Sequence, residues 1–134
     1  MAVAHSGRSP YLPTLILDAD AAAAEILAEQ LRLYNLPAEV ATSCWAAHAA
    51  VRRKHYRSLV IVADLHLPTD LNCITGLRAR ALSSWIVVIG VSKQSPDAPQ
   101  LVWRCGADAL LVAPFSLIDL ISRLFAFSLR PRPA

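Results

Sequence analysis

Residues 59–68 read Leu-Val-Ile-Val-Ala-Asp-Leu-His-Leu-Pro, and residues 86–90 read Ile-Val-Val-Ile-Gly. Both apolar runs are continuous rather than alternating, and both are rich in β-branched residues. This pattern is typical of strands that are buried on both faces, as in a parallel sheet. Residues 14–17 and 109–112 have a similar composition, and residues 38–41 form a weaker candidate. The sequence therefore predicts five buried strands.

Segments with the apolar spacing of helices lie between these runs. They cover residues 23–34, 45–52, 71–81, 101–105 and 117–125. Ser95-Pro96 is typical of a helix start, and Ser116 with Asp119 is typical of a capping box. Strands and helices in strict alternation predict an α/β fold, a doubly wound five-stranded parallel sheet with flanking helices.

The chain has 134 residues, which suits a single domain. We assign residues 13–128 to that domain, residues 1–12 to a flexible N-terminal tail, and residues 129–134 to a basic Pro-rich tail or linker stub. The net charge is +3, but three cations lie in the two tails, so the body is neutral. The charge therefore does not indicate nucleic-acid binding by this domain alone. The basic residues 52–57 are expected to be a solvated helix C-terminus, with an acidic partner surface as the alternative.

Composition excludes several protein classes. Apolar residues make up 55% of the chain, which excludes disorder, and no apolar run reaches the roughly 18 residues of a membrane span. The N-terminus has no apolar signal region, so we expect a cytoplasmic protein with no membrane partner. Three well-separated cysteines, Cys44, Cys73 and Cys105, predict free thiols in a reducing compartment and no Cys/His metal cluster. Trp45, Trp85 and Trp103 lie in or beside the predicted elements, so we expect core or partly exposed packing rather than a stacking platform.

Carboxylates follow two of the predicted strands. Asp18 directly follows residues 14–17, Asp20 comes two residues later, and Asp64 directly follows the third strand. Ligands bind outside the carboxyl ends of strands in an open parallel sheet, and converging carboxylates suit Mg²⁺. The alternative is that Asp18 or Asp20 caps the first helix, and we favour that interpretation for Asp20.

These motifs together resemble the receiver domain of two-component response regulators. The resemblance rests on a strand followed by acids at 14–20, Asp-Leu-His-Leu-Pro at 64–68, and Cys-Gly-Ala-Asp-Ala-Leu-Leu-Val-Ala-Pro-Phe at 105–115. It covers about residues 13–128 and implies the flavodoxin-like (βα)5 receiver fold. It also implies that Asp64 takes the position that accepts a phosphoryl group from a histidine kinase. The implied Mg²⁺ ligands are Asp18, Asp20, Asp64 and the backbone carbonyl of His66.

The chain departs from the family at the positions that assist this chemistry. Ala19 replaces the second of two successive acids, and Ala113 occupies the lysine position before Pro-Phe. Gly90 occupies the position of the switch hydroxyl, with Ser92 two residues later, and Leu110 occupies an aromatic position. Phosphoryl transfer depends on charge compensation, and each lost group is expected to cost about 10²–10³ in rate. Mg²⁺ is therefore expected to bind weakly or not at all.

Three functions fit this sequence. We favour an atypical receiver that is not an enzyme, a protein-interaction module that binds a histidine kinase or a downstream regulator. The alternative is a working phosphoacceptor at Asp64 with a rearranged Mg²⁺ site. A remote alternative is a small phosphohydrolase using Asp18 and Asp20, although the expected Gly-Thr and cap domain are missing. The resemblance also implies a docking or homodimer face formed by the fourth helix, the fifth strand and the fifth helix, which includes Trp103 and the helix from Leu117.

Overall fold

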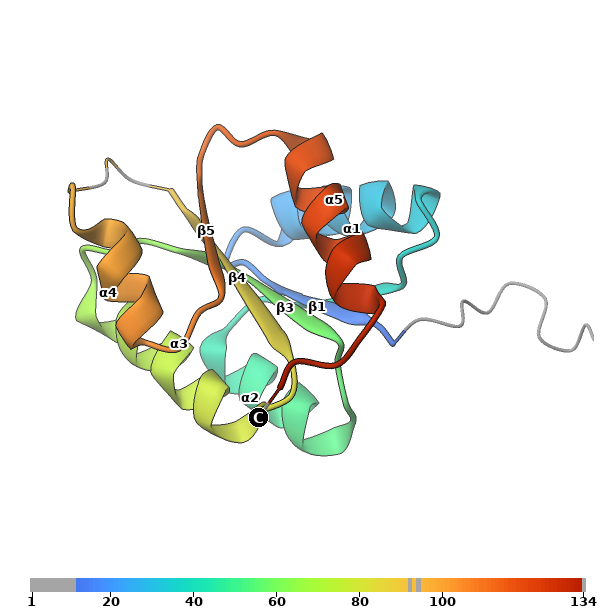
Figure 1. Cartoon of the computed structure of the whole chain (residues 1–134), viewed down its shortest axis with the longest axis horizontal. Helices are drawn as coiled ribbons and strands as arrows, with labels where there is room; N and C mark the ends of the chain where they lie inside the picture. Colours follow the sequence, from blue (N-terminus) through green and yellow to red (C-terminus); the bar gives the residue numbers. More distant parts are fainter. Residues whose placement is uncertain (1–11, 92, 94, 134) are drawn as a thin grey trace, which may run out of the picture.

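Strands and helices alternate along the whole described chain (Figure 1). A computed structural model describes residues 12–91, 93 and 95–133. The expected N-terminal tail, apart from Leu12, lies outside these residues, and so does Ser92. The elements are β1 (Thr14–Leu17), α1 (Ala21–Leu33), β2 (Ala38–Ala41), α2 (Cys44–Arg53), β3 (Ser58–Ala63), α3 (Pro68–Arg80), β4 (Trp85–Gly90), α4 (Ala98–Arg104), β5 (Ala109–Val112) and α5 (Leu117–Ser128).

The strands form one sheet in the order β2-β1-β3-β4-β5, and every pair is parallel. The predicted doubly wound α/β fold is therefore confirmed. The chain moves outward from β1 in both directions, so the order of strands reverses between β1 and β3. In this topology the reversal opens a crevice at the carboxyl ends of these two strands, where ligands bind.

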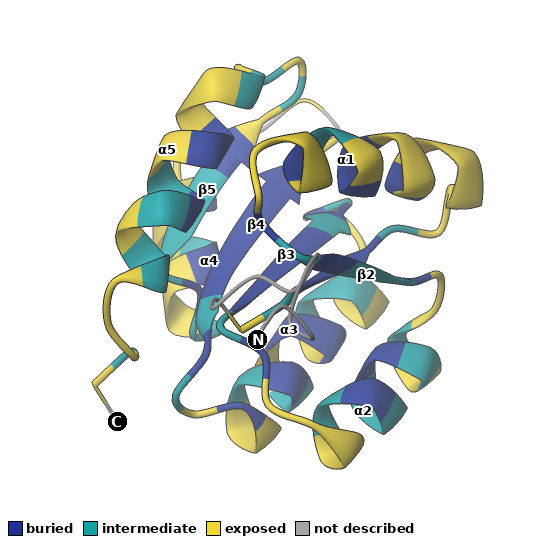
Figure 2. Ribbon diagram, turned by 90° about the vertical axis from the view of Figure 1, so that its right-hand side faces the viewer, coloured by how far each residue is buried: buried dark blue, intermediate teal, exposed yellow. Residues whose placement is uncertain are grey.

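Two helical layers cover the sheet. One face packs apolar residues of α1 and α5 against Ile16, Val60 and Val87. The other face packs α2, α3 and α4 against Leu15, Leu59 and other strand residues of the opposite orientation. Side chains alternate between the two faces of a strand, so each continuous apolar run contributes residues to both cores. Figure 2 shows the central strands as the most buried elements.

Side-chain caps set where most helices begin. Asp20, Ser43 and Ser116 each accept a hydrogen bond from the backbone N–H three residues later, at 3.1, 3.0 and 3.2 Å. The predicted helix start at Ser95-Pro96 is wrong by two residues. The Ser95 carbonyl accepts from the N–H of Ala98 at 3.0 Å, which closes a turn before α4, and Pro99 is the proline in the first turn of the helix.

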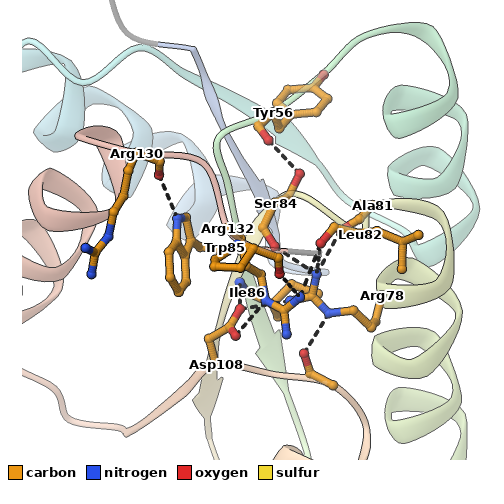
Figure 3. Close-up of polar contacts among 12 residues, drawn as sticks. Tyr56, Arg78, Ala81, Leu82, Ser84, Trp85, Ile86, Asp108, Arg130 and Arg132 are labelled. Atoms are coloured by element: carbon orange, nitrogen blue, oxygen red, sulfur yellow. Dashed lines mark hydrogen bonds and ion pairs between the residues drawn. The ribbon is translucent and has the colours of Figure 1, made fainter.

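The segment after α5 returns to the amino end of β4 (Figure 3). Trp85 stacks on Phe127 with ring centroids 4.4 Å apart, and its indole N–H donates to the Arg130 carbonyl at 3.1 Å. Arg132 donates to the Asp108 carboxylate at 2.8 Å. Residues of the expected C-terminal tail thus contact the domain directly. Within the described residues, no helix is both long and apolar enough to span a bilayer.

Candidate functional site

The candidate site lies at the carboxyl ends of β1 and β3. Leu17, the last residue of β1, pairs with Ile61, and β3 continues to Ala63. Asp18 and Asp64 directly follow these two strands, so both carboxylates project from the same edge of the sheet. This is the crevice at which the topology favours ligand binding.

Asp64 is partly buried and hydrogen-bonded within its own loop. Its Oδ1 accepts from the N–H of His66 at 2.9 Å, and its N–H donates to Oδ2 of Asp70 at 2.8 Å. Asp70 lies in the first turn of α3, so a further carboxylate reaches this edge from the helix. Sequence reasoning missed Asp70. The one feature of the sequence that points to Asp70 is its position two residues after Pro68, in the first turn of a helix, where the helix dipole favours negative charge.

Asp20 serves the first helix rather than the strand edge. Its Oδ1 accepts from the N–H of Ala23 at 3.1 Å, and its own N–H donates to Oδ1 of Asp18 at 2.9 Å. The favoured interpretation of Asp20 as a helix cap is therefore confirmed. The phosphohydrolase alternative needs Asp20 as a general acid, but its carboxylate is already hydrogen-bonded to the first turn of α1.

The donor set at this edge suits Mg²⁺ only in part. Asp18 and Asp64 offer carboxylate oxygens, which are the hard ligands that Mg²⁺ prefers. Among residues 12–91, 93 and 95–133, however, one group of three candidate ligands has all its ligand atoms within 4.8 Å of one another. That group is Cys44, His48 and Cys73, and it contains no carboxylate. An ion here would therefore depend on Asp18 and Asp64, and the wider predicted set with Asp20 and the His66 carbonyl stays a prediction.

A cavity of about 180 Å³ lies beside this edge, on the side of the sheet covered by α2 and α3. Ala19 and Asp70 line it, together with residues at the ends of β1 and β3 and with Cys44 and Cys73. Among its described lining residues, Asp70 carries the one carboxylate. The methyl group of Ala19 therefore borders open space at the position where the resembled family has its second acid.

The positions predicted from the resemblance to assist phosphoryl transfer or switching carry apolar or small groups. Gly90 is buried at the end of β4, and its carbonyl accepts from the N–H of Ala113 at 2.9 Å. Ala113 packs with the core beneath α1 and α5, and Leu110 packs with the opposite core. Ala113 thus places a methyl group where the family has an ammonium group.

The loop after β3 also contacts the loop after β4. A ring N–H of His66 donates to the Lys93 carbonyl at 2.6 Å. The imidazole of His66 therefore links two loops of the candidate site, a role that the sequence did not reveal because the two residues are 27 positions apart.

The prediction of three free thiols is wrong. Cys44 and Cys73 form a disulfide with their Cα atoms 6.0 Å apart, whereas Cys105 is free. The fold brings the two together by packing α2 against α3, which a separation of 29 residues cannot indicate. The expected absence of a Cys/His cluster is also wrong, because His48 lies beside this pair. Burial, followed by the charges of Arg80 and Arg52, lowers the pKa of His48.

The basic residues 52–57 are largely structural. Arg52 and Arg53 lie in the last turn of α2, as predicted for cations at a helix C-terminus. Lys54 pairs with Glu39, which also accepts from the Tyr56 hydroxyl at 2.7 Å. Burial alone would raise the pKa of Glu39, but its hydrogen bonds with Lys54 and Tyr56 lower it below the ordinary value.

Two of the three tryptophans are more exposed than the expected core or partly exposed packing. Trp45 on α2 is 78% exposed, and Trp103 on α4 is 72% exposed. Val102 is buried under α4, and the next residue along the helix, Trp103, therefore lies on its outer side. Trp103 borders a cavity of about 340 Å³ between α4 and β5, which is lined mainly by apolar residues. This aromatic ring lies on the expected docking face.

Comparisons with known proteins identify the architecture. No protein-family model and no curated protein matches the sequence. The structure is similar to the receiver domain of the Francisella response regulator 1452, with a TM-score of 0.75, 21% identity, and coverage of 89% of this chain and 98% of that one. A response regulator from Thermotoga maritima gives a TM-score of 0.76 at 18% identity, covering 89% of this chain and 99% of that one.

A third similar structure contains a modified aspartate. It is a response regulator protein from Burkholderia pseudomallei with a phosphorylated aspartic acid, a calcium ion and citrate. The TM-score is 0.69 at 21% identity, and the match covers 86% of this chain and 71% of that one. The chain thus has the fold of response regulator receiver domains.

Proposed function

We propose that the chain is an atypical receiver domain of two-component signal transduction, acting mainly through protein–protein contacts rather than as an enzyme. Its phosphoacceptor position is Asp64, and phosphorylation there is impaired. The observation that carries this proposal is the pair of alanines at the candidate site. Ala19 borders a cavity instead of supplying a carboxylate, and Ala113 is partly buried against the core instead of supplying an ammonium group.

The impairment follows from the electrostatics of phosphoryl transfer. The transferred group carries negative charge on its equatorial oxygens, and a metal ion and a cation must compensate it. In this site Asp70 adds a carboxylate to Asp18 and Asp64 without adding a cation. With the capped Asp20 turned to α1, Asp18 and Asp64 alone would hold Mg²⁺, which would supply charge compensation when bound.

A working phosphoacceptor with a rearranged site is the second candidate. The observation in its favour is that Asp18 and Asp64 end neighbouring strands, as a shared metal ion requires. Asp70 could supply the missing third carboxylate, because its Oδ2 already lies 2.8 Å from the backbone nitrogen of Asp64. A phosphorylated aspartate with a calcium ion in the Burkholderia pseudomallei protein supports the general chemistry of such a site.

Phosphorylation by acetyl phosphate with Mg²⁺ separates the two candidates. We expect the unaltered chain to be modified at least about 10²-fold more slowly than Ala19→Asp/Ala113→Lys, because each restored group contributes about 10²–10³ in rate. Intact-mass measurement detects the added phosphoryl group. The matched control is Ala126→Asp/Ala79→Lys, which adds the same charges at exposed helix positions. Modification of the unaltered chain as fast as the restored variant, and lost in Asp64→Asn, would establish the working phosphoacceptor instead.

The partners of this domain are proteins in this proposal: a histidine kinase, a downstream regulator, or a second copy of the chain. The face formed by α4, β5 and α5 supports a docking role, because Trp103, Val112 and Ile118 are exposed on these elements. We assign it no nucleic acid or membrane partner, and a cytoplasmic location. Sedimentation of the full chain at increasing concentration tests the homodimer, with Trp103→Ala expected to weaken it and Trp45→Ala, on another helix, serving as the control.

A further inference from the structure

Cys44, His48 and Cys73 lie together between α2 and α3. The two cysteines also line the cavity beside the candidate phosphorylation site, but none of the three residues is among its predicted Mg²⁺ ligands. Cys44 is the first residue of α2, and His48 lies one turn later on the same helical face. Cys73 faces them from α3. The two sulfur atoms and an imidazole nitrogen all lie within 4.8 Å of one another. Cys73 is buried, whereas Cys44 and His48 are partly exposed, so solvent reaches the cluster.

Gly76 allows the imidazole of His48 to approach α3. A Cβ atom at Gly76 would lie 3.1 Å from Cε1 and 3.2 Å from Nε2 of His48, which is tighter than nine in ten real Cβ contacts. Gly76 is one turn after Cys73, so the ring lies against the backbone beside the second cysteine. A disulfide needs no imidazole at this point, whereas two cysteines and a histidine this close together offer three ligand types that bind Zn²⁺.

We propose that the chain, once its disulfide is reduced, binds one Zn²⁺ through the thiolates of Cys44 and Cys73 and the imidazole of His48. Two sulfur ligands and one imidazole form a soft donor set that favours Zn²⁺ over Mg²⁺. Zn–S bonds of about 2.3 Å in tetrahedral geometry place two sulfurs about 3.8 Å apart. The Cα separation of 6.0 Å accommodates this once the S–S bond is broken and the side chains rotate. Water completes the fourth position.

Disulfide and metal exclude each other at this site. Two molecules of a low-molecular-weight thiol, RSH, reduce the S–S bond, giving the two cysteine thiols and one RSSR. Binding of Zn²⁺ then releases the two thiol protons, because the metal ligands are thiolates. The oxidised sulfurs are bonded to each other and offer no thiolate. The same three residues thus distinguish an oxidised, cross-linked form from a reduced, zinc-bound form.

Cobalt titration of the full chain tests the site directly. We expect reduced protein to bind one equivalent of Co²⁺ with near-ultraviolet thiolate-to-cobalt charge transfer, and Zn²⁺ to displace it. His48→Gln keeps both thiols and is expected to weaken Zn²⁺ binding by more than the about 10- to 100-fold that loss of an outer-shell contact costs. Gly76→Ala, which displaces the ring, is expected to weaken binding while all three ligands remain.

Three comparisons decide whether this site is the one that binds. Cys105→Ser removes the remaining cysteine and should leave binding unchanged, and the oxidised protein should bind no Co²⁺. Cys44→Ser and Cys73→Ser should each reduce the charge-transfer band, with far-ultraviolet circular dichroism confirming that the variants are folded. His48→Gln keeps the test decisive if a cysteine variant unfolds. The proposal is wrong if reduced protein shows no charge transfer, or if the band depends on Cys105 and not on His48.

Discussion

Replacement of Asp108 by alanine should destabilise the domain strongly. Its carboxylate accepts from the Arg78 guanidinium at 2.8 Å, from the Ile86 N–H at 2.9 Å and from Arg132 at 2.8 Å (Figure 3). The side chains of Asp108 and Arg78 are only 14% and 12% exposed. Asp108 thus fixes the start of β5 to β4, to α3 and to the segment after α5.

The expected cost of Asp108→Ala combines two losses. The Ile86 N–H would lose its acceptor, which costs about 1–3 kcal/mol for a buried donor. Arg78 would lose its carboxylate partner, and removing one partner of a buried ion pair costs about 3–5 kcal/mol. Arg78 keeps the carbonyls of Gly106, Ala81 and Ser84 at 2.7 to 2.8 Å, so its charge stays partly compensated. We therefore expect about 3 kcal/mol in total, and a fall in Tm on the order of 10 °C.

Urea unfolding followed by tryptophan fluorescence measures this loss. The control is Asp119→Ala, which removes an exposed ion pair with Arg123 at 3.2 Å. Exposed pairs contribute about 0–1 kcal/mol, so the midpoint of the control should change little. A loss for Asp108→Ala no larger than that of the control would refute the assignment of Asp108 as the centre of a buried polar network.

Three further predictions follow from single residues. Hydrogen bonds with Lys54 and Tyr56 lower the pKa of Glu39 despite burial, so its carboxylate stabilises the fold above the ordinary pKa of 4.5 and loses this effect as pH falls through the folded pKa. Glu39→Gln should therefore flatten the dependence of stability on pH in this acid range, and an unchanged acid unfolding curve would contradict the prediction. Gly106 has a φ of +101°, so Gly106→Ala should destabilise the fold by at least about 1 kcal/mol in urea unfolding, and a neutral effect would exclude that backbone strain. Trp103→Ala should leave the unfolding midpoint within about 0.5 kcal/mol, since the side chain is exposed, and a larger loss would place the ring in the core.

The fold was predictable because the apolar runs specify it locally. Four short continuous apolar runs and a weaker fifth at residues 38–41, separated by helical spacing, predict a parallel sheet covered on both faces. Ser116 marks the start of α5 as its sequence predicts. The start of α4 was misplaced because both Pro96 and Pro99 satisfy the local rule for an initial proline. A local turn, closed by the hydrogen bond from the Ala98 N–H to the Ser95 carbonyl, precedes the helix, so Pro96 lies in the turn and Pro99 in the first turn of α4.

The site was predictable only where its residues directly follow strands. Asp18 and Asp64 have that position in the sequence, whereas Asp70 reaches the same edge from a helix by a contact between residues six positions apart. The disulfide and His48 depend on how α2 packs against α3, which no spacing along one helix records. Sequence patterns thus indicate positions along single elements, and the missed residues all act between elements.

The fold of this chain and the chemistry proposed for it depend on different residues. The sheet is stabilised by apolar strands, but phosphoryl transfer needs charged groups in the loops that follow them. Relative to the receiver pattern that the chain resembles, alanine at positions 19 and 113 replaces one acid and one cation. These two differences cancel in the net charge of the chain. Neither alanine disturbs the packing, since Ala113 packs against the core and Ala19 borders a cavity. A metal ion and a lysine compensate charge on the same phosphoryl group, so restoring one of them leaves the other loss in place. For this reason the double variant Ala19→Asp/Ala113→Lys, rather than either single variant, tests whether Asp64 accepts a phosphoryl group once both charged groups are present.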